Sequence, residues 1–363
     1  MSRYYVHFYN KNNFGDDLFV DLMARTYPQH TFDIHGPRDF TEKFRTLKNV
    51  RVHYDSLATS ALNLTARTFG FQGDFVQSQR ANPCSEVIYI GGSLFMVPPP
   101  EEKERFYQQT RNMKIRHLPF NIAGANISDF SDEEHNAFCH EFFTDCSWIS
   151  FRDELSASHF SDLKQVHVFP DIAFVLRRMA PDLPDTDSSG KKAVIVSVLG
   201  RQKVDDYPAY LMKMAGWVNT LSEKDPVILL SLCDQEGDLK TCQEILQHVR
   251  KPENIQILNY QGNIREILEA IAHAKLMIGA RFHSIVAALA LGTPVIPLIY
   301  ADKTAEMLRL AGFKGRSYPL SVLPDPDGDL FADLKAQTLS DEQAEKMAAQ
   351  ALRHFDFMGG DHV

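Results

Sequence analysis

The pattern of hydrophobic and polar residues along the chain predicts strands and helices in alternation. Short apolar runs at 87–90 and 194–198 have the length of buried strands. Other segments place apolar residues three to four positions apart, as in 264–271, which predicts helices with one buried face. Alternation of this kind is typical of an α/β protein with parallel, doubly wound sheets.

One Pro-, Asp- and Ser-rich segment interrupts this alternation, which then starts again after it. Such a composition is typical of a linker, so the chain is predicted to form two Rossmann-like domains. Two domains of this kind, joined by a linker, would face each other across a cleft. The predicted parts are a first domain at 1–180, a linker at 181–192, a second domain at 193–335, and at 336–363 a C-terminal helix that packs back on the first domain.

The most informative stretch is 276–303, which predicts a strand, a turn, a short buried helix and a second strand. Arg281, His283 and Ser284 fall in the turn, and Lys303 follows the second strand. A cation, an imidazole and a hydroxyl at the carboxyl end of a strand, beside a helix N-terminus, suit binding an anion and moving a proton. A single histidine at such a turn is more often a structural residue, but the three together favour a functional site.

Polar residues and glycines also follow the predicted strands of the first half. Asp16 or Asp17 could equally be a simple helix cap, and that alternative stays open. The glycine pair after the 87–90 strand lacks the third glycine of a dinucleotide-binding loop. Ligands of open α/β sheets bind at the carboxyl ends of strands, so these positions are candidates for the cleft. The candidates are Asn13, Asp16, Gly91, Gly92, Arg152 and Asp171.

Composition narrows the classes of function. The 363-residue chain has a formal net charge of -9, which argues against general binding to nucleic acid. We expect no transmembrane segment, because no apolar run is long enough, and the five cysteines predict reduced thiols in a cytoplasmic protein. Cys139 lies near His135 and His140, but without a second cysteine pair an ordinary helix face is the better interpretation than a metal site. We therefore expect no metal.

Taken together, the motifs resemble those of the polysaccharide pyruvyltransferases. The block around the 276–303 helix is the most specific of them. The sequence departs from the family pattern at Ser93, where a third glycine is common, and at Ala125-Asn126, where a Gly-Pro pair is common. The matching motifs are Asn13-x-Gly15-Asp16, Ile90-Gly91-Gly92, Ser150-x-Arg152-Asp153, Pro170-Asp171, Ser197 to Arg201, Gly279-x-Arg281-x-His283-Ser284, Gly292-x-Pro294 and Tyr300-x-x-Lys303.

The resemblance implies a fold like that of the two-domain GT-B glycosyltransferases, with the acceptor on the first domain and the donor on the second. It implies transfer of a pyruvyl group from phosphoenolpyruvate to two hydroxyls of a sugar, forming a cyclic ketal, with no cofactor. His283 and Arg281 are then the expected catalytic residues. The expected donor-binding residues are Arg201, Ser284, Lys303 and Gly279.

Two other functions stay open at this stage. One is a GT-B-type glycosyltransferase that uses a nucleotide-sugar donor, and the other is a glycan-binding relative that has lost the chemistry. The partners expected from the resemblance are phosphoenolpyruvate and a sugar acceptor, free or lipid-linked. A lipid-linked acceptor would bring the protein to the inner membrane surface. The sequence predicts no oligomeric state.

Overall fold

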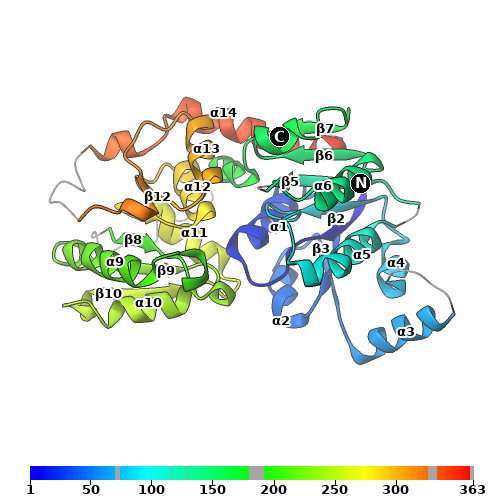
Figure 1. Ribbon diagram of the computed structural model, residues 1–363, viewed down its shortest axis with the longest axis horizontal. Helices are drawn as coiled ribbons and strands as arrows, with labels where there is room; N and C mark the ends of the chain where they lie inside the picture. The colour runs from blue at the N-terminus through cyan, green and yellow to red at the C-terminus, as the bar shows by residue number, and fades with distance from the viewer. Residues whose placement is uncertain (70–73, 116, 128, 180–191, 326–332, 360–363) are drawn as a thin grey trace. The chain divides into compact units, whose positions relative to one another are not determined.

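The computed structural model describes residues 1–69, 74–115, 117–127, 129–179, 192–325 and 333–359. These residues form two compact units, each built on one sheet (Figure 1). The first unit comprises Met1–Lys11, Phe19–Phe169 and Arg353–Val363, and the second comprises Asn12–Leu18 and Pro170–Leu352. The fold class expected from the hydrophobic pattern is therefore confirmed.

The sheet of the first unit has seven strands, all parallel, in the order β3-β2-β1-β4-β5-β6-β7 within the described residues. The strands are β1 Arg3–His7, β2 Thr31–Gly36, β3 Val50–Tyr54, β4 Glu86–Ile90, β5 Phe120–Ala125, β6 Trp148–Phe151 and β7 Val166–Val168. The helices are α1 Phe14–Thr26, whose first residues belong to the second unit, α2 Arg38–Thr41, α3 Leu57–Thr68, α4 Phe75–Ala81, α5 Lys103–Met113, α6 Glu133–Thr144 and α7 Glu154–Ser158. Short 3-10 turns are η1 Glu42–Thr46, η2 Pro100–Glu102 and η10 Arg353–Met358.

The second unit has six parallel strands in the order β10-β9-β8-β11-β12-β13, again within the described residues. They are β8 Val194–Ser197, β9 Val227–Ser231, β10 Ile255–Asn259, β11 Leu276–Gly279, β12 Val295–Ile299 and β13 Tyr318–Pro319. The helices are α8 Leu176–Met179, α9 Tyr207–Ser222, α10 Asp238–Leu246, α11 Ile264–His273, α12 Phe282–Leu291, α13 Asp302–Leu310 and α14 Asp341–Leu352. Its 3-10 turns are η3 Ile172–Val175, η5 Arg201–Lys203, η6 Asp234–Glu236, η7 Pro252–Asn254, η8 Leu320–Val322 and η9 Leu334–Gln337.

The direction of strand addition explains how helices cover both faces of the second sheet. From β8 the chain adds β9 and β10 on one side, then returns to add β11 and β12 on the other. Right-handed crossovers that run in opposite directions place their helices on opposite faces. The point between β8 and β11 is thus a switch point, where open α/β sheets bind ligands.

Helix α12 packs tightly because its sequence is small and apolar on nearly every side. Ile285 to Ala290 are all buried. A Cβ at Gly279 would lie 2.7 Å from Cγ1 of Ile285, so a glycine there permits close contact between β11 and α12. Gly292 ends the helix with a left-handed φ of 74°, a conformation that favours glycine.

The structure corrects three details of the predicted organisation. The units divide after Phe169 rather than at 180, and the segment Asn12–Leu18 belongs to the second unit. Helix α14 packs against η3 within the second unit, and only the following η10 joins the first. The predicted linker lies, except for Lys192, outside the described residues.

Candidate functional site

The turn between β11 and α12 is held by two serines that are fully buried. Ser197, at the end of β8, accepts hydrogen bonds from the backbone N–H of Ala280 (2.9 Å) and of Arg281 (3.3 Å). The Ser284 hydroxyl donates to the carbonyl of Arg281 at 2.6 Å and lies 2.8 Å from the Ser197 hydroxyl. Ser284 therefore stabilises the turn, and its donor-binding role stays a prediction.

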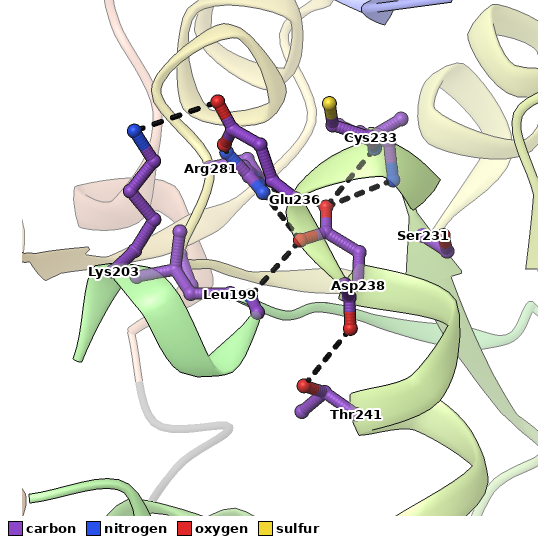
Figure 2. A network of polar contacts seen from close by, with 12 residues as sticks. Leu199, Lys203, Ser231, Cys233, Glu236, Asp238, Thr241 and Arg281 are labelled. Atoms are coloured by element: carbon purple, nitrogen blue, oxygen red, sulfur yellow. Dashed lines mark hydrogen bonds and ion pairs between the residues drawn. The ribbon is translucent and has the colours of Figure 1, made fainter.

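Arg281 is directed at two carboxylates of the connection from β9 to α10 (Figure 2). Its Nε donates to Asp238 at 2.8 Å, and a terminal nitrogen makes a second, short bond to the same carboxylate. The other terminal nitrogen makes an equally short bond to Glu236. Burial would lower the pKa of Arg281, but the two carboxylates outweigh it and raise that pKa, so the guanidinium stays charged.

Asp238 is the fully buried acceptor that connects three strand ends. Besides Arg281 after β11, its carboxylate accepts from the N–H of Leu232 (3.2 Å) and Cys233 (3.1 Å) after β9. It also accepts from the N–H of Gly200 (3.0 Å) after β8. Burial raises the pKa of Asp238, while Arg281 and the backbone donors oppose that rise. One side chain thus fixes the carboxyl ends of β8, β9 and β11.

Glu236 lies at the outer side of the same network and is partly exposed. Its carboxylate contacts Arg281 and is 3.4 Å from Nζ of Lys203. Burial favours a higher pKa for Glu236, but Arg281 and Lys203 outweigh it and lower that pKa. Glu236 therefore carries a negative charge between two cations.

His283, in the first turn of α12, is enclosed by two segments of the second unit. A Cβ at Gly15 would lie 1.8 Å from Nδ1 of His283, so the backbone of the first turn of α1 lies directly against the ring. Nε2 of His283 is 3.8 Å from a carboxylate oxygen of Asp171, beyond hydrogen-bond length but within range of an ion pair when the ring is protonated. The His283 side chain is 17% exposed and that of Asp171 only 1%.

The segment Asn12–Leu18 is held on the second unit by specific contacts. Phe14 donates its N–H to the carbonyl of Leu232 at 3.2 Å, and Tyr260 donates its hydroxyl to Asp17 at 2.7 Å. The Asn13 side chain accepts from the N–H of Gly15 at 3.0 Å, which supports the start of α1. Asn13 is therefore a capping residue.

Both acidic residues in the first turn of α1 are buried, Asp16 at 7% exposure and Asp17 at 0%. The side-chain bond at the start of α1 is made by Asn13, which precedes the first helical residue and accepts the N–H of Gly15. The capping role left open between the two aspartates thus belongs to Asn13. Asp16 stays a predicted cleft residue.

The remaining predicted donor residues lie in different surroundings. Lys303, at the start of α13, has its ammonium 5.7 Å from the Phe282 ring, next to His283 in sequence. Arg201 is exposed in η5 and stacks on Tyr207, with 4.7 Å between guanidinium carbon and ring centroid. Gly279 is buried against α12 and serves packing. Of these three residues, Lys303 is thus the one that the structure places against a sequence neighbour of His283.

Two predicted residues of the first unit, Gly92 and Arg152, are in contact with each other. A Cβ at Gly92 would lie 2.6 Å from the guanidinium carbon of Arg152, so the glycine lets this flat group pack on the backbone. Arg152 donates from Nε to the side-chain oxygen of Asn126 at 3.1 Å. Gly91 has a φ of 154°. The acceptor of this hydrogen bond, Asn126, is one of the positions where the sequence departs from the family pattern.

Asp171 combines two roles that the sequence could not separate. It caps η3 by accepting from the N–H of Ala173 at 2.9 Å, and its second oxygen is the one near His283. Sequence reasoning missed Asp238, Glu236 and Lys203 as partners of this region. The available signal was their position after β8 and β9, at the same edge of the sheet as the end of β11, but the strand order was needed to recognise it.

Neither a membrane-spanning helix nor a metal-binding cluster is found in the described parts of the chain. None of their helices is both long enough and apolar enough to span a bilayer. They also contain no group of three or more His, Cys, Asp or Glu side chains arranged to hold a metal ion. His135 and Cys139 are buried in the apolar core of the first unit, where the imidazole lies 3.1 Å from the carbonyl of Phe95.

Solved structures with two Rossmann-like domains are similar to this chain over nearly its whole length. Anabaena HepE in complex with UDP and glucose has a TM-score of 0.54 at 13% identity, covering 99% of this chain and 96% of that chain. A putative UDP-N-acetylglucosamine 2-epimerase from Listeria monocytogenes has a TM-score of 0.59 at 11% identity, covering 99% and 98%. The fold is therefore that of the GT-B class of glycosyltransferases and epimerases.

The sequence itself identifies the family within that class. The family model for polysaccharide pyruvyl transferase matches residues 13–303, and the chain belongs to this family. The amylovoran biosynthesis protein AmsJ of Erwinia amylovora is 20% identical over 296 residues, covering 75% of this chain and 70% of AmsJ. The family places the chain among the transferases of polysaccharide biosynthesis.

Proposed function

We propose that this protein transfers a pyruvyl group from phosphoenolpyruvate to two hydroxyls of a sugar in a polysaccharide or its precursor, forming a cyclic ketal. The observation that carries the proposal is the setting of His283, a partly exposed imidazole beside the backbone of Gly15 and the carboxylate of Asp171. Membership of the pyruvyl transferase family supports a pyruvyl donor, and this geometry supports a role for the imidazole in moving a proton.

In the proposed reaction His283 acts as an acid and then as a base. Its protonated ring delivers a proton to the methylene carbon of phosphoenolpyruvate, and the central carbon becomes an oxocarbenium-like electrophile. The first sugar hydroxyl bonds to that carbon and gives up its proton to the imidazole. The bond from carbon to the phosphate oxygen breaks, the phosphate leaves with the proton of the second hydroxyl, and that hydroxyl closes the ketal.

Asp171 is proposed as the residue that positions this imidazole. At 3.8 Å from Nε2 it is not a constant hydrogen-bond partner, but it stabilises the ring when the ring carries a proton. Asp171 is almost wholly buried, and its bond to the N–H of Ala173 fixes the carboxylate in position relative to the ring. An acid that must be protonated before it reacts benefits from such a neighbour.

The cations are proposed to act in two different ways. Lys303, and Arg201 on η5, are the exposed or partly exposed cations suited to hold the phosphate and carboxylate of the donor. Arg281 is instead bound to two carboxylates, so we propose that it first holds the turn carrying His283 in place. The catalytic role expected for Arg281 from the family resemblance then requires a change in its contacts.

A nucleotide-sugar donor is the alternative, and solved structures of the same fold bound to UDP are the observation that favours it. A glycan-binding protein without activity is the other. A lipid-linked acceptor would extend the proposal to a protein working at the inner membrane surface, and a free sugar acceptor would keep it in the cytoplasm.

The donor can be identified by incubating the protein with galactosyl, mannosyl and glucosyl acceptors and either phosphoenolpyruvate or a panel of UDP-sugars. The proposal predicts phosphate release that requires both phosphoenolpyruvate and one class of acceptor. Release of UDP from a nucleotide sugar, with none of phosphate from phosphoenolpyruvate, would replace it with the glycosyltransferase alternative. Acceptor binding without turnover of either donor would favour the non-catalytic alternative.

A further inference from the structure

The carboxylate of Glu236 lies where two cations of different chain segments meet. Arg281 reaches it from the turn after β11, and Lys203 reaches it from η5 after β8. Figure 2 shows Lys203 and Arg281 converging on this side chain from different elements. Two cations placed in this way can bind an anion, and in this structure the anion that they bind is the carboxylate of Glu236.

The two acidic residues on Arg281 are not equivalent. Asp238 is fully buried, and its oxygens also accept three backbone N–H groups, so it cannot leave without exposing those donors. Glu236 makes no comparable set of backbone bonds among the described contacts, and its side chain is 25% exposed. Of the two, Glu236 is the one that solvent and a ligand can reach.

Release of Glu236 would not disturb the chain around it. Its carbonyl packs against Gly200, where a Cβ would lie 1.7 Å from the oxygen, so the backbone is fixed. The turn then ends at Gly237, with a left-handed φ of 89°. Because the backbone is held, the carboxylate can leave Arg281 and Lys203 by rotation about its own side-chain bonds.

We propose that Lys203 and Arg281 form an anion-binding site that Glu236 occupies in the unliganded protein, and that a phosphate or carboxylate group of the substrate binds by displacing Glu236. With Glu236 in place the two cations are balanced by Asp238 and Glu236. With Glu236 turned away one positive charge is left in excess, which attracts an anion. The identification of this anion with the phosphoenolpyruvate group rests on the proposed function.

The test uses inorganic phosphate, titrated into the intact protein by calorimetry, and needs no turnover. Glu236→Gln removes the charge of the internal competitor but keeps an oxygen and a side chain of the same length. We expect phosphate to bind about three- to tenfold more tightly, the size of effect that a partly exposed ion pair produces. Lys203→Met is expected to weaken binding by a similar factor.

Glu269→Gln is the matched control. Glu269 is 21% exposed and pairs with Arg265 at 2.8 Å along α11, so the substitution removes the same charge at similar exposure elsewhere in the unit. It should leave phosphate affinity unchanged. Equal tightening in both variants would attribute the effect to net charge and overturn the inference.

The outcomes separate this inference from the proposed function. Unchanged or weaker phosphate binding in Glu236→Gln, in a protein that still releases phosphate from phosphoenolpyruvate, overturns the inference and leaves the function standing. Tighter binding in a protein that never uses phosphoenolpyruvate supports the site and removes the function. If Glu236→Gln does not fold, unchanged phosphate affinity in Lys203→Met overturns the inference.

Discussion

At the scale of the residue, the chemistry of the site depends on neighbours that come from distant parts of the sequence. The imidazole of His283 was predictable because it follows a buried strand and begins a helix. The setting of Arg281 was not, because Glu236 and Asp238 approach it only through the strand order. A sequence motif thus locates a charged side chain, but its partners decide whether that side chain is available to a ligand.

Asp171→Asn tests whether the carboxylate assists the imidazole. The amide keeps an oxygen that can cap η3 but removes the charge 3.8 Å from His283. We expect kcat to fall about tenfold to hundredfold, with little change in KM for the donor, because the protonated ring loses its stabilisation while the donor's contacts remain. Initial rates over a pH series check this, and an unchanged kcat would remove Asp171 from the mechanism.

Gly15→Ala tests the close contact between the α1 turn and the ring. The new methyl group would meet Nδ1 of His283 at 1.8 Å, so the imidazole must move, and we expect about a hundredfold loss of rate. Gly216→Ala in α9 is the control, because a Cβ there has no atom within 4 Å among the described residues. It should stabilise the protein by about 0.5 to 1 kcal/mol and leave the rate unchanged. Equal rates for both variants would contradict the close contact between Gly15 and the ring of His283.

At the scale of the element, the second sheet is held together at its carboxyl edge by one acidic residue. The ends of β8, β9 and β11 all donate to Asp238, either directly or through Arg281. Nothing in the sequence marks Asp238 as more than the first residue of α10. The hydrophobic pattern predicts strands and helices well, but it carries no information about which strand ends become neighbours.

Asp238→Asn is expected to destabilise the second unit. It removes one of the two carboxylates that neutralise the buried Arg281 and replaces an acceptor of backbone N–H groups with an amide. We expect a loss of about 3 to 5 kcal/mol, since breaking one side of a buried ion pair leaves charge uncompensated. Asp225→Asn, which loses a more exposed pair with Lys275, should cost less than about 1 kcal/mol. Urea unfolding midpoints of the two variants give the comparison, and similar shifts would contradict the connecting role of Asp238.

The first sheet is expected to lose stability in mild acid. Burial, with a smaller effect from the nearby His35, lowers the pKa of His7 from 6.5 to about 4. Between these values the unfolded chain binds a proton that the folded chain does not, so stability falls as pH falls through this range. At pH 5 the loss is roughly 2 kcal/mol from this residue. His7→Phe should reduce the drop in melting temperature between pH 7 and pH 5, and an equal drop in both proteins would show that His7 is charged when folded.

At the scale of the whole molecule, the sequence predicted the two Rossmann-like units but misplaced where the chain passes between them. Asn12–Leu18 joins the second unit although it lies between β1 and most of α1, both elements of the first. Its contacts with Leu232, Tyr260 and His283 join residues more than two hundred positions apart, and periodicity within a short window cannot detect them. The end of the first domain was predicted at 180 from the composition of the linker. The contacts between residues instead place the segment from Pro170 onwards in the second unit.

The most direct measurement of the central claim is the rate of phosphate release from phosphoenolpyruvate, with a saturating acceptor, in the wild type and in His283→Ala. The account predicts a loss of at least about a hundredfold in the variant, with the melting temperature nearly unchanged, because a proton-transfer group has been removed from an intact turn. A variant rate close to that of the wild type would contradict the claim that this imidazole carries out the chemistry.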